Sequence, residues 1–245
     1  MKNWDILKGK IKEYDKIVFL GGAGVSTESG IPDFRSKTGL YSSPNKYKYP
    51  PEVMLSRDFF NKYPEEFFTF YKEKMVYPDL KPNKCHYALA ALEKAGKLRA
   101  IITQNIDGLH QAAGSKNVIE LHGGVSRNFC KKCNKFYSSA QLLDILKASP
   151  IPYCDDCGGI IKPDVVLYQE QLDRAVISKA VDSIAKAEVL IVAGTSLTVN
   201  SAAGMLRFFD GDFLAIINKD ETFYDDNADV VIRESLGEVM DYVVH

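Results

Sequence analysis

Short apolar runs alternate with longer stretches of mixed polarity along most of the chain. The runs are rich in β-branched side chains and are bounded by glycine or polar residues, as the buried strands of parallel sheets are. Between them, apolar residues recur at the spacing of amphipathic helices. This alternation predicts an α/β fold in which a parallel sheet is covered by helices on both faces. The predicted strands are 17–20, 100–103, 118–121, 165–168, 189–193, 213–217 and 230–232, and the predicted helices are 3–14, 83–95, 173–187, 201–209 and one that starts at Ser235.

Two stretches interrupt the alternation. Residues 36–82 are aromatic and basic, and residues 125–160 contain four of the five cysteines. Interleaved aromatic and lysine residues are typical either of a surface that stacks nucleic-acid bases or of a helical module that fills its own core. The helical module is favoured by the spacing of four aromatic residues, Phe60, Phe67, Phe68 and Tyr71.

The composition is that of an ordinary globular protein, with 46% hydrophobic and 26% charged residues in a chain of 245. This length suits one large domain, or one domain with a smaller insertion. A formal net charge of -1 gives no overall field that would attract nucleic acid or a membrane, so neither is expected as a direct partner. The amphipathic start and the lack of any apolar run of membrane-spanning length predict a cytoplasmic protein. The sequence leaves the oligomeric state open and is compatible with a monomer.

The cysteine spacing predicts a metal site. Cys130 and Cys133 form one Cys-x2-Cys pair, and Cys154 and Cys157 form a second after twenty intervening residues. In a cytoplasmic chain such pairs favour a metal over disulfides. Four thiolates complete the tetrahedral shell of Zn²⁺ and leave no position for water, so we predict one structural zinc per chain. Cys85 lies in a predicted helix and is expected to be a small buried apolar residue rather than a nucleophile.

The strand 17–20 runs into a glycine turn that includes Gly22 and Gly24. Glycine lets the backbone turn sharply and approach a ligand, and Ser26 or Thr27 is placed to cap a following helix whose N-terminus would favour phosphate. The dinucleotide fingerprint is incomplete, because Thr27 stands at the third glycine position and the usual acid about 20 residues later is missing. The stretch is therefore either a cofactor loop or a simple turn.

The segment that follows, residues 30–35, reads Gly-Ile-Pro-Asp-Phe-Arg. It places a rigid Ile-Pro joint beside an acid, an aromatic ring and a guanidinium. Asp33, Phe34 and Arg35 are residue types suited to holding an aromatic, positively charged base and a phosphate.

Polar residues are crowded directly after three predicted strands, where open parallel sheets bind ligands. Residues 104–110 include Asn105 and Asp107, which are either paired polar groups in a pocket or an Asx-type cap of the next helix. His122 ends another strand and is either a general base, given an ordinary pKa of about 6.5, or a packed strand-end residue. Residues 194–196, Gly-Thr-Ser, either contact phosphate or ribose or form a simple turn.

Taken in order, these motifs resemble the sirtuins, the NAD-dependent protein lysine deacylases, over nearly the whole chain and as a single catalytic core of the bacterial type. The matching stretches are GAGVS at 22–26, GIPDFR at 30–35, TQNID at 103–107, LHG at 121–123, the two Cys-x2-Cys pairs and GTSL at 194–197.

The resemblance implies two domains. A Rossmann-like NAD-binding domain comprises residues 1–35, 83–124 and 161–245. A small domain combines a helical insertion, 36–82, with the zinc module, 125–160. The acyl-lysine peptide is implied to lie in the cleft between the two domains, with NAD beneath it.

The resemblance also implies roles for individual residues. His122, Asn105 and Asp107 are the implied catalytic residues. The implied cofactor contacts are Gly22, Ala23, Gly24, Thr27, Asp33, Phe34, Arg35, Gln104, Asn105, Ile106, Asp107, His122, Gly194, Thr195, Ser196 and Asn218. The implied peptide contacts are Val165, Val166, Tyr168, Gln169 and Glu170.

Two departures from the family lie near the implied peptide channel. Tyr168-Gln169-Glu170 stands where the family commonly has Phe-Gly-Glu, which puts Gln169 where a glycine allows close backbone approach. Asn200-Ser201 stands where Tyr-Pro is frequent.

The implied reaction consumes NAD. The acyl oxygen attacks the ribose carbon as nicotinamide leaves, His122 deprotonates a ribose hydroxyl, and water finally releases lysine and O-acyl-ADP-ribose. Asn105 and Asp107 are implied to position nicotinamide and water. Two other functions stay open, namely mono-ADP-ribosyl transfer from the same pocket and a non-catalytic module that senses NAD or ADP-ribose. The combination of His122 with the run 105–107 favours a catalytic pocket.

The acyl preference follows from an absence. The sirtuin branch that prefers malonyl and succinyl lysine carries a Tyr-x-x-Arg pair, and here those positions are Phe68 and Tyr71. Burying a carboxylate without a cation costs on the order of several kcal/mol. Acetyl or longer apolar acyl groups are therefore expected over succinyl.

Overall fold

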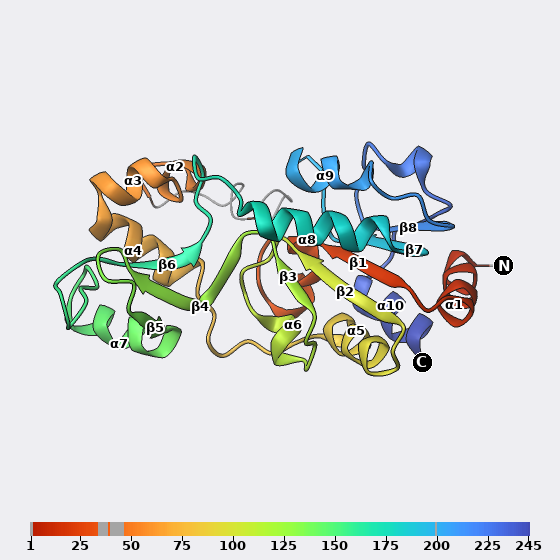
Figure 1. Cartoon of the computed structure of the whole chain (residues 1–245), viewed down its shortest axis with the longest axis horizontal. Helices are drawn as coiled ribbons and strands as arrows, with labels where there is room; N and C mark the ends of the chain where they lie inside the picture. The colour runs from red at the N-terminus through yellow and green to blue at the C-terminus, as the bar shows by residue number, and fades with distance from the viewer. Residues whose placement is uncertain (1, 34–38, 40–46, 199) are drawn as a thin grey trace.

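The larger sheet of the computed structural model is wholly parallel, with six strands in the order β3-β2-β1-β7-β8-β9 (Figure 1). The structure describes residues 2–33, 39, 47–198 and 200–245. Each strand of this sheet overlaps a predicted one, so the Rossmann-like α/β prediction is confirmed. The strands are β1 (Ile17–Gly21), β2 (Leu98–Thr103), β3 (Val118–Glu120), β7 (Val189–Ala193), β8 (Phe213–Ile217) and β9 (Val230–Ile232).

Two groups of helices cover opposite faces of this sheet (Figure 1). Successive side chains of a strand point to opposite faces, and all five residues of β1 are buried. Ile17 and Phe19 therefore pack under one group of helices, while Val18 and Leu20 pack under the other. The first group is α1 (Asn3–Glu13), α5 (Lys84–Lys94) and α10 (Leu236–Val244), and the second is α8 (Arg174–Ala185) and α9 (Asn200–Leu206).

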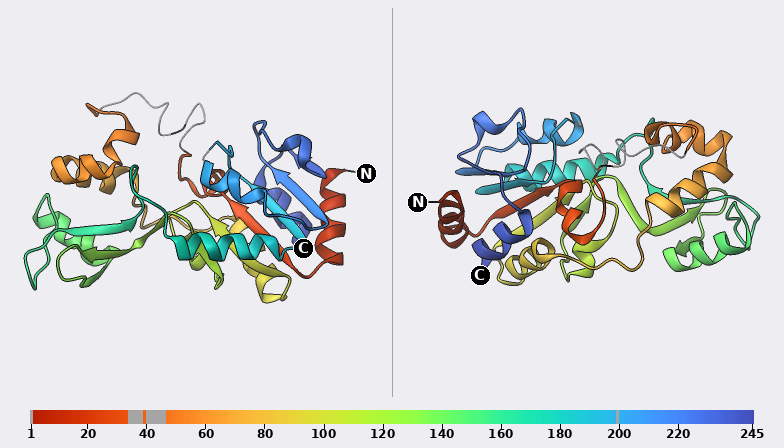
Figure 2. Two further views of the ribbon diagram at one scale, coloured as in Figure 1. Left: turned by 45° about the horizontal axis from the view of Figure 1, so that its top comes forward. Right: turned by 180° about the vertical axis from the view of Figure 1, so that it is seen from behind.

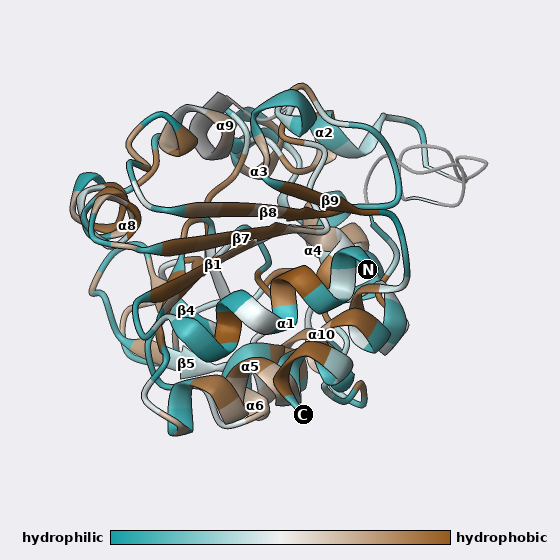
Figure 3. Ribbon diagram, turned by 90° about the vertical axis from the view of Figure 1, so that its right-hand side faces the viewer, coloured by the Kyte–Doolittle hydropathy of each residue, from teal (hydrophilic) through white to brown (hydrophobic). Residues whose placement is uncertain are grey.

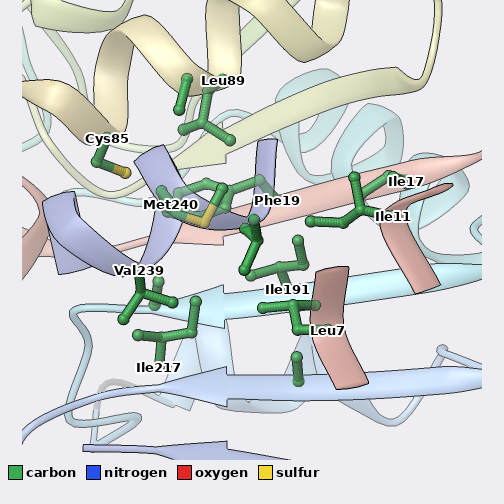
Figure 4. Packing of buried hydrophobic residues seen from close by; sticks show 14 of the residues in the cluster. Leu7, Ile11, Ile17, Phe19, Cys85, Leu89, Ile191, Ile217, Val239 and Met240 are labelled. Carbon is green, nitrogen blue, oxygen red and sulfur yellow. The ribbon is translucent and has the colours of Figure 1, made fainter. Parts of the chain in front are cut away.

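The core beneath the first group is continuous and apolar. Leu7 of α1, Phe19 of β1 and Met240 of α10 belong to a single buried cluster (Figure 4), and the strands that they cover are hydrophobic throughout (Figure 3). Cys85 belongs to the same cluster with no exposed surface, and its burial raises the pKa of the thiol. The prediction that Cys85 is a buried apolar residue is confirmed.

The second sheet is small and antiparallel, in the order β5-β4-β6. It consists of β4 (Gly123–Cys130), β5 (Phe136–Ser138) and β6 (Ile161–Val165), and α7 (Ser139–Ala148) packs beside it. With the helices of residues 51–74 it forms one end of the elongated molecule (Figure 2). The sheet extends beyond the predicted zinc module at both ends, and the division into two domains stays a prediction.

The predicted strand 165–168 is wrong as a strand of the parallel sheet. Val165 ends β6, and the residues after it bond to separate segments. The Val166 N–H donates to the carbonyl of His122 at 2.9 Å, and the Tyr168 N–H donates to the carbonyl of Leu55 at 3.0 Å. The segment is a connecting loop that bonds to both parts of the molecule. An apolar run is therefore not sufficient evidence for a strand.

The aromatic stretch forms helices that fill their own core. The helices are α2 (Pro51–Met54), α3 (Arg57–Lys62) and α4 (Pro64–Lys74). Phe60, Phe67, Phe68 and Tyr71 are each at most 2% exposed, which confirms the helical-module prediction over the stacking surface. Residues of the small sheet belong to the same buried cluster, so the two insertions share one core. Among the described residues, no helix is long and apolar enough to cross a membrane.

Candidate active site

The sheet order places a crevice at the carboxyl ends of β1 and β7. The chain runs outward from β1 through β2 to β3 on one side, and β7, β8 and β9 follow on the other side. The strand order therefore reverses its direction between β1 and β7, and open α/β sheets bind ligands in the crevice at such a reversal. A cleft of about 1080 Å³ lies here, and its walls also include Leu55, Tyr71 and residues 165–170 from the other end of the molecule.

The glycine turns after β1 and β7 pack directly against each other. The Gly24 N–H donates to the carbonyl of Gly194 at 2.8 Å. A Cβ on Gly24 would lie 2.7 Å from the Gly194 Cα, and one on Gly22 would lie 2.7 Å from the Gly194 carbonyl oxygen. Gly194 itself has φ +59°, the left-handed region that favours glycine. The contact between the two turns therefore requires glycine at these positions, whether or not a ligand also approaches the backbone.

The helix expected after the first glycine turn is absent. Two short 3-10 turns, η1 (Ala23–Val25) and η2 (Thr27–Ser29), take its place. The Thr27 hydroxyl donates back to the Gly24 carbonyl at 3.0 Å, and the Ser26 side chain makes no cap. Ser26 and Thr27 match the sequence pattern of a helix cap, but their hydroxyls bond to other groups.

Ser26 instead connects the two implied catalytic polar residues. Its hydroxyl, in a side chain that is 1% exposed, donates to Asp107 Oδ2 at 2.7 Å and accepts from Asn105 Nδ2 at 3.0 Å. Ser26 was missed as a site residue by the sequence analysis, although it directly follows the motif Gly-Ala-Gly-Val. The structure brings these three side chains together at the base of the cleft.

Asp107 bonds both to the polar cluster and to the start of the next helix. Its Oδ2 accepts from Ser26, while its Oδ1 accepts from the Leu109 N–H at 2.8 Å in an Asx turn that leads into α6 (Leu109–Ala112), whose N-cap is Gly108. Burial raises the pKa of this carboxyl, and the two hydrogen bonds act in the opposite direction. A partly buried carboxyl held from both sides is a fixed acceptor in the cleft wall.

His122 lies in the cleft with one ring nitrogen already bonded. Its Nδ1 is 2.8 Å from the carbonyl oxygen of Gln104. A carbonyl oxygen only accepts, so Nδ1 carries the proton of the neutral ring and Nε2 is left as an acceptor. Burial lowers the pKa of His122, and the bond to Gln104 opposes that shift. The ring is therefore neutral near pH 7 and oriented to take up a proton, as a general base must be.

The second turn is tied to the same run of polar residues. The Thr195 hydroxyl donates to Gln104 Oε1 at 2.9 Å, and Thr195 Oγ1 accepts from the Leu197 N–H at 3.3 Å. Thr195, Ser196 and Asn218 all line the cleft, and Asn218 directly follows β8. The remaining predicted cofactor residues on its wall are Ala23, Gly24, Thr27, Asp33, Gln104, Ile106 and Gly194. Phe34 and Arg35 lie outside the described residues.

All five predicted peptide contacts line the cleft. The Glu170 carboxylate is already occupied, because it accepts from Lys162 Nζ at 3.1 Å and from the Leu167 N–H at 2.9 Å. Gln169 has φ +72°, a left-handed value that favours glycine. It stands at the sequence position where the family commonly has glycine. The two bonds of Glu170 hold the shape of the loop.

The four cysteines fit a structural zinc. Their Sγ atoms all lie within 4.8 Å of one another, with 3.4 Å between Cys130 and Cys157 and 3.6 Å between Cys133 and Cys154. A tetrahedron with Zn–S bonds of about 2.3 Å has sulfur atoms about 3.8 Å apart. The Tyr137 hydroxyl donates to Cys154 Sγ at 3.1 Å and lowers the pKa of that thiol, which favours the thiolate that zinc requires. No cysteine lies in the cleft wall, so the metal would hold the fold and not the substrate.

The profile of the Sir2 family matches residues 22–201, which is more than half of the chain. The chain belongs to the Sir2 family. A curated sirtuin from Clostridium acetobutylicum, named NAD-dependent protein deacetylase, is 56% identical to this one over 238 residues, covering 97% of this chain and 96% of the relative.

Solved structures of other Sir2 proteins share the fold of this sirtuin. One contains a deacetylated p53 peptide and 3′-O-acetyl ADP ribose. It is 40% identical with a TM-score of 0.89, and 99% of this chain matches 97% of that one. Another, a Sir2 homolog in complex with NAD, is 40% identical with a TM-score of 0.87 and matches 98% of this chain and 92% of its own.

Proposed function

We propose that this sirtuin is an NAD-dependent protein lysine deacetylase that releases nicotinamide and O-acyl-ADP-ribose. The observation that carries the proposal is the neutral His122 ring, whose Nε2 is a free acceptor in the same cleft as the Ser26–Asn105–Asp107 cluster. A base beside fixed polar groups suits a reaction in which a ribose hydroxyl must lose a proton before it attacks.

Different residues of the cleft suit different parts of the NAD molecule. Gln104, Asn105, Ile106 and Asp107 would surround nicotinamide and its ribose, with Asp107 as a fixed acceptor. Thr195 and Ser196 offer hydroxyls on the phosphate side, and the Asn218 amide lies beyond β8 for the adenosine ribose. NAD is the substrate from which nicotinamide leaves, and the chain contributes binding groups and the His122 base.

The acyl-lysine would enter from the side of residues 165–170. The proposed small domain, 36–82 with 125–160, and the proposed NAD-binding domain, 1–35 with 83–124 and 161–245, both contribute to the cleft wall. An acyl-lysine in that position would reach the nicotinamide ribose between the two domains. We further propose that the protein acts in the cytoplasm, where reduced thiols are available for zinc.

The test is nicotinamide release from NAD in the presence of an acetyl-lysine peptide. Wild-type protein should release nicotinamide and remove the acetyl group. His122→Ala should lose at least about a hundredfold in deacetylation while it still binds NAD, because only the base is removed. Full activity in His122→Ala would contradict the assignment of the base.

Two other outcomes point to the other candidate functions. A peptide whose mass rises by one ADP-ribose, instead of falling by one acetyl group, would identify a mono-ADP-ribosyltransferase. NAD binding without release of nicotinamide would identify a sensing module.

A further inference from the structure

The loop that follows β8 forms one wall of the cleft. Asn218, Lys219 and Asp220 come directly after the strand, and all three line the cleft. Residues 218–226 contain four acids and a single lysine. A loop of this charge repels itself and the anionic pyrophosphate of NAD unless a cation from another segment offsets it.

Arg233 supplies that cation and bonds to the loop at three points. Its Nη1 donates to the Asn218 carbonyl at 3.0 Å and to the Asp220 carbonyl at 2.9 Å, and its Nη2 pairs with the Asp225 carboxylate. Arg233 directly follows β9, which lies beside β8 as its parallel neighbour (Figure 3). The planar guanidinium therefore spans from the end of one strand to the loop that leaves the other.

The groups that Arg233 contacts are themselves held in place. Asp225 accepts from the Thr222 N–H at 3.0 Å and from the Thr222 hydroxyl at 2.7 Å. Burial raises the pKa of Asp225, but the bonds from Thr222 and Arg233 outweigh it and hold the pKa below its usual value, so the carboxylate stays charged. The Asn218 amide donates to the same Asp220 carbonyl, at 2.8 Å. The loop is thus fixed from Asn218 to Asp225.

We propose that Arg233 is a positioning residue for NAD, which holds the loop 218–225 ready for the adenosine half of the dinucleotide. The inference rests on the proposed function, in which Asn218 serves the adenosine ribose. Arg233 is not part of the cleft wall, so it acts through Asn218 and Asp220. A loop that already has its binding conformation loses less entropy when the ligand arrives.

The experiment replaces Arg233 by methionine, which keeps an apolar stem and removes the charge and every donor. The KM for NAD at saturating acetyl-lysine peptide and the Kd of ADP-ribose by calorimetry should each rise by about tenfold. The KM for the peptide at saturating NAD and the kcat should stay within about twofold of wild type, because only nucleotide binding is weakened. A general loss of structure would not separate the two substrates in this way.

Two further variants complete the series. Arg233→Lys keeps the charge, but a single nitrogen cannot span all three acceptors, so its KM for NAD should lie between those of wild type and Arg233→Met. Arg99→Met is the matched control, because the exposed Arg99 also donates to a backbone carbonyl, that of Asp15 at 3.0 Å. Arg99 lies at the amino end of β2, away from the cleft, and its loss should leave the KM for NAD unchanged.

Several outcomes would overturn the inference. An unchanged KM for NAD in Arg233→Met is sufficient, and so is a rise in the KM for the peptide as large as that for NAD. If Arg233→Met does not fold, a wild-type KM for NAD in Arg233→Lys overturns it instead. A wild-type protein that binds ADP-ribose but releases no nicotinamide would contradict the proposed deacetylase alone, and the Kd of ADP-ribose would still decide the role of Arg233.

Discussion

Gln169 and Asp58 hold each other by two reciprocal hydrogen bonds across 111 residues of sequence. The Asp58 N–H donates to Gln169 Oε1 and the Gln169 amide donates to Asp58 Oδ2, both at 3.1 Å. The left-handed φ of Gln169 costs on the order of 1 kcal/mol for a residue with a Cβ. The two bonds offset that cost and fasten the loop 165–170 to the start of α3.

This relationship predicts effects of different size for two substitutions at Gln169. Gln169→Ala removes both bonds and keeps the strain, so we expect the KM for an acetyl-lysine peptide to rise several-fold with kcat little changed. Gln169→Gly removes the bonds and the strain together, and we expect a smaller rise. Peptide-dependent kinetics at saturating NAD measure both. If Gln169→Gly were the worse of the two variants, the strain would not matter and the argument would fail.

Ser26→Ala should reduce kcat/KM by about tenfold to a hundredfold. The substitution removes a hydrogen bond to the partly buried Asp107 carboxylate and one to the Asn105 amide, and bonds to charged groups are worth about 1.5–3 kcal/mol. Ser29→Ala is the matched control, because that buried hydroxyl lies in the following turn and has no partner among the described residues. It should retain wild-type activity. Equal activity in both variants would remove Ser26 from the site.

Two buried histidines predict loss of stability on mild acidification. Burial lowers the pKa of His86 to about 4 and that of His110 to about 3, and the Asn83 N–H donates to His86 Nδ1 at 3.2 Å. Both rings are neutral in the folded state, whereas the unfolded chain binds protons below about pH 6.5. Their contribution is therefore complete above pH 6.5 and is lost as the pH falls toward 4.

The expected loss between pH 6.5 and pH 5 is roughly 2 kcal/mol for each histidine. Urea unfolding at pH 7.5 and pH 5 measures it. His110→Gln should lose less stability between the two pH values than the wild type, even if it is less stable at both. The exposed His245 serves as the control, and His245→Gln should keep the wild-type pH dependence. The same pH dependence in His110→Gln and wild type would contradict the prediction.

Zinc should be present at one ion per chain and should be needed for activity without touching substrate. Cys130 ends β4 and Cys133 follows it, while Cys154 and Cys157 precede β6. The far end of β4 directly follows His122, and Val165 at the end of β6 lines the cleft. Cys133→Ser should lower the zinc content and the melting temperature, and deacylase activity should fall with them. Elemental analysis gives the metal content.

Cys85→Ala is the control for that experiment, because it removes a thiol from the apolar core and leaves the four ligands intact. It should retain one zinc per chain. A zinc-free protein with an unchanged melting temperature would show that the cysteines do not hold the fold through a metal.

The strands of the parallel sheet were predictable because each one contains a local apolar run that is largely buried. The run 165–168 had the same composition but no place in that sheet, since its backbone groups bond to His122 and Leu55. A pattern read along the chain does not show which segment supplies the partner. The same reason explains why the aromatic core of α3 and α4 was predictable from its spacing, whereas its contact with the small sheet was implied only by the family resemblance.

The site residues, too, were predictable only where a pattern along the chain marks them. His122 and Asp107 were found because polar residues after buried strands mark ligand sites in such sheets. The sequence offers Ser26 or Thr27 as a helix cap, because a serine after a glycine turn has the same local pattern whether it caps a helix or bonds to a carboxylate. The contact of Gly24 with Gly194 joins residues far apart in sequence and follows only from the pairing of β1 with β7.

The pairing of β1 with β7 also has a consequence for the growing chain on the ribosome. β1 is the first strand to be synthesised, but one of its two neighbours follows both insertions in the sequence. Until residues 189–193 leave the exit tunnel, one edge of a fully apolar strand lacks its partner, and such edges are prone to aggregation. Chains that terminate before β7 should therefore depend on chaperones and should lack half of the nucleotide crevice.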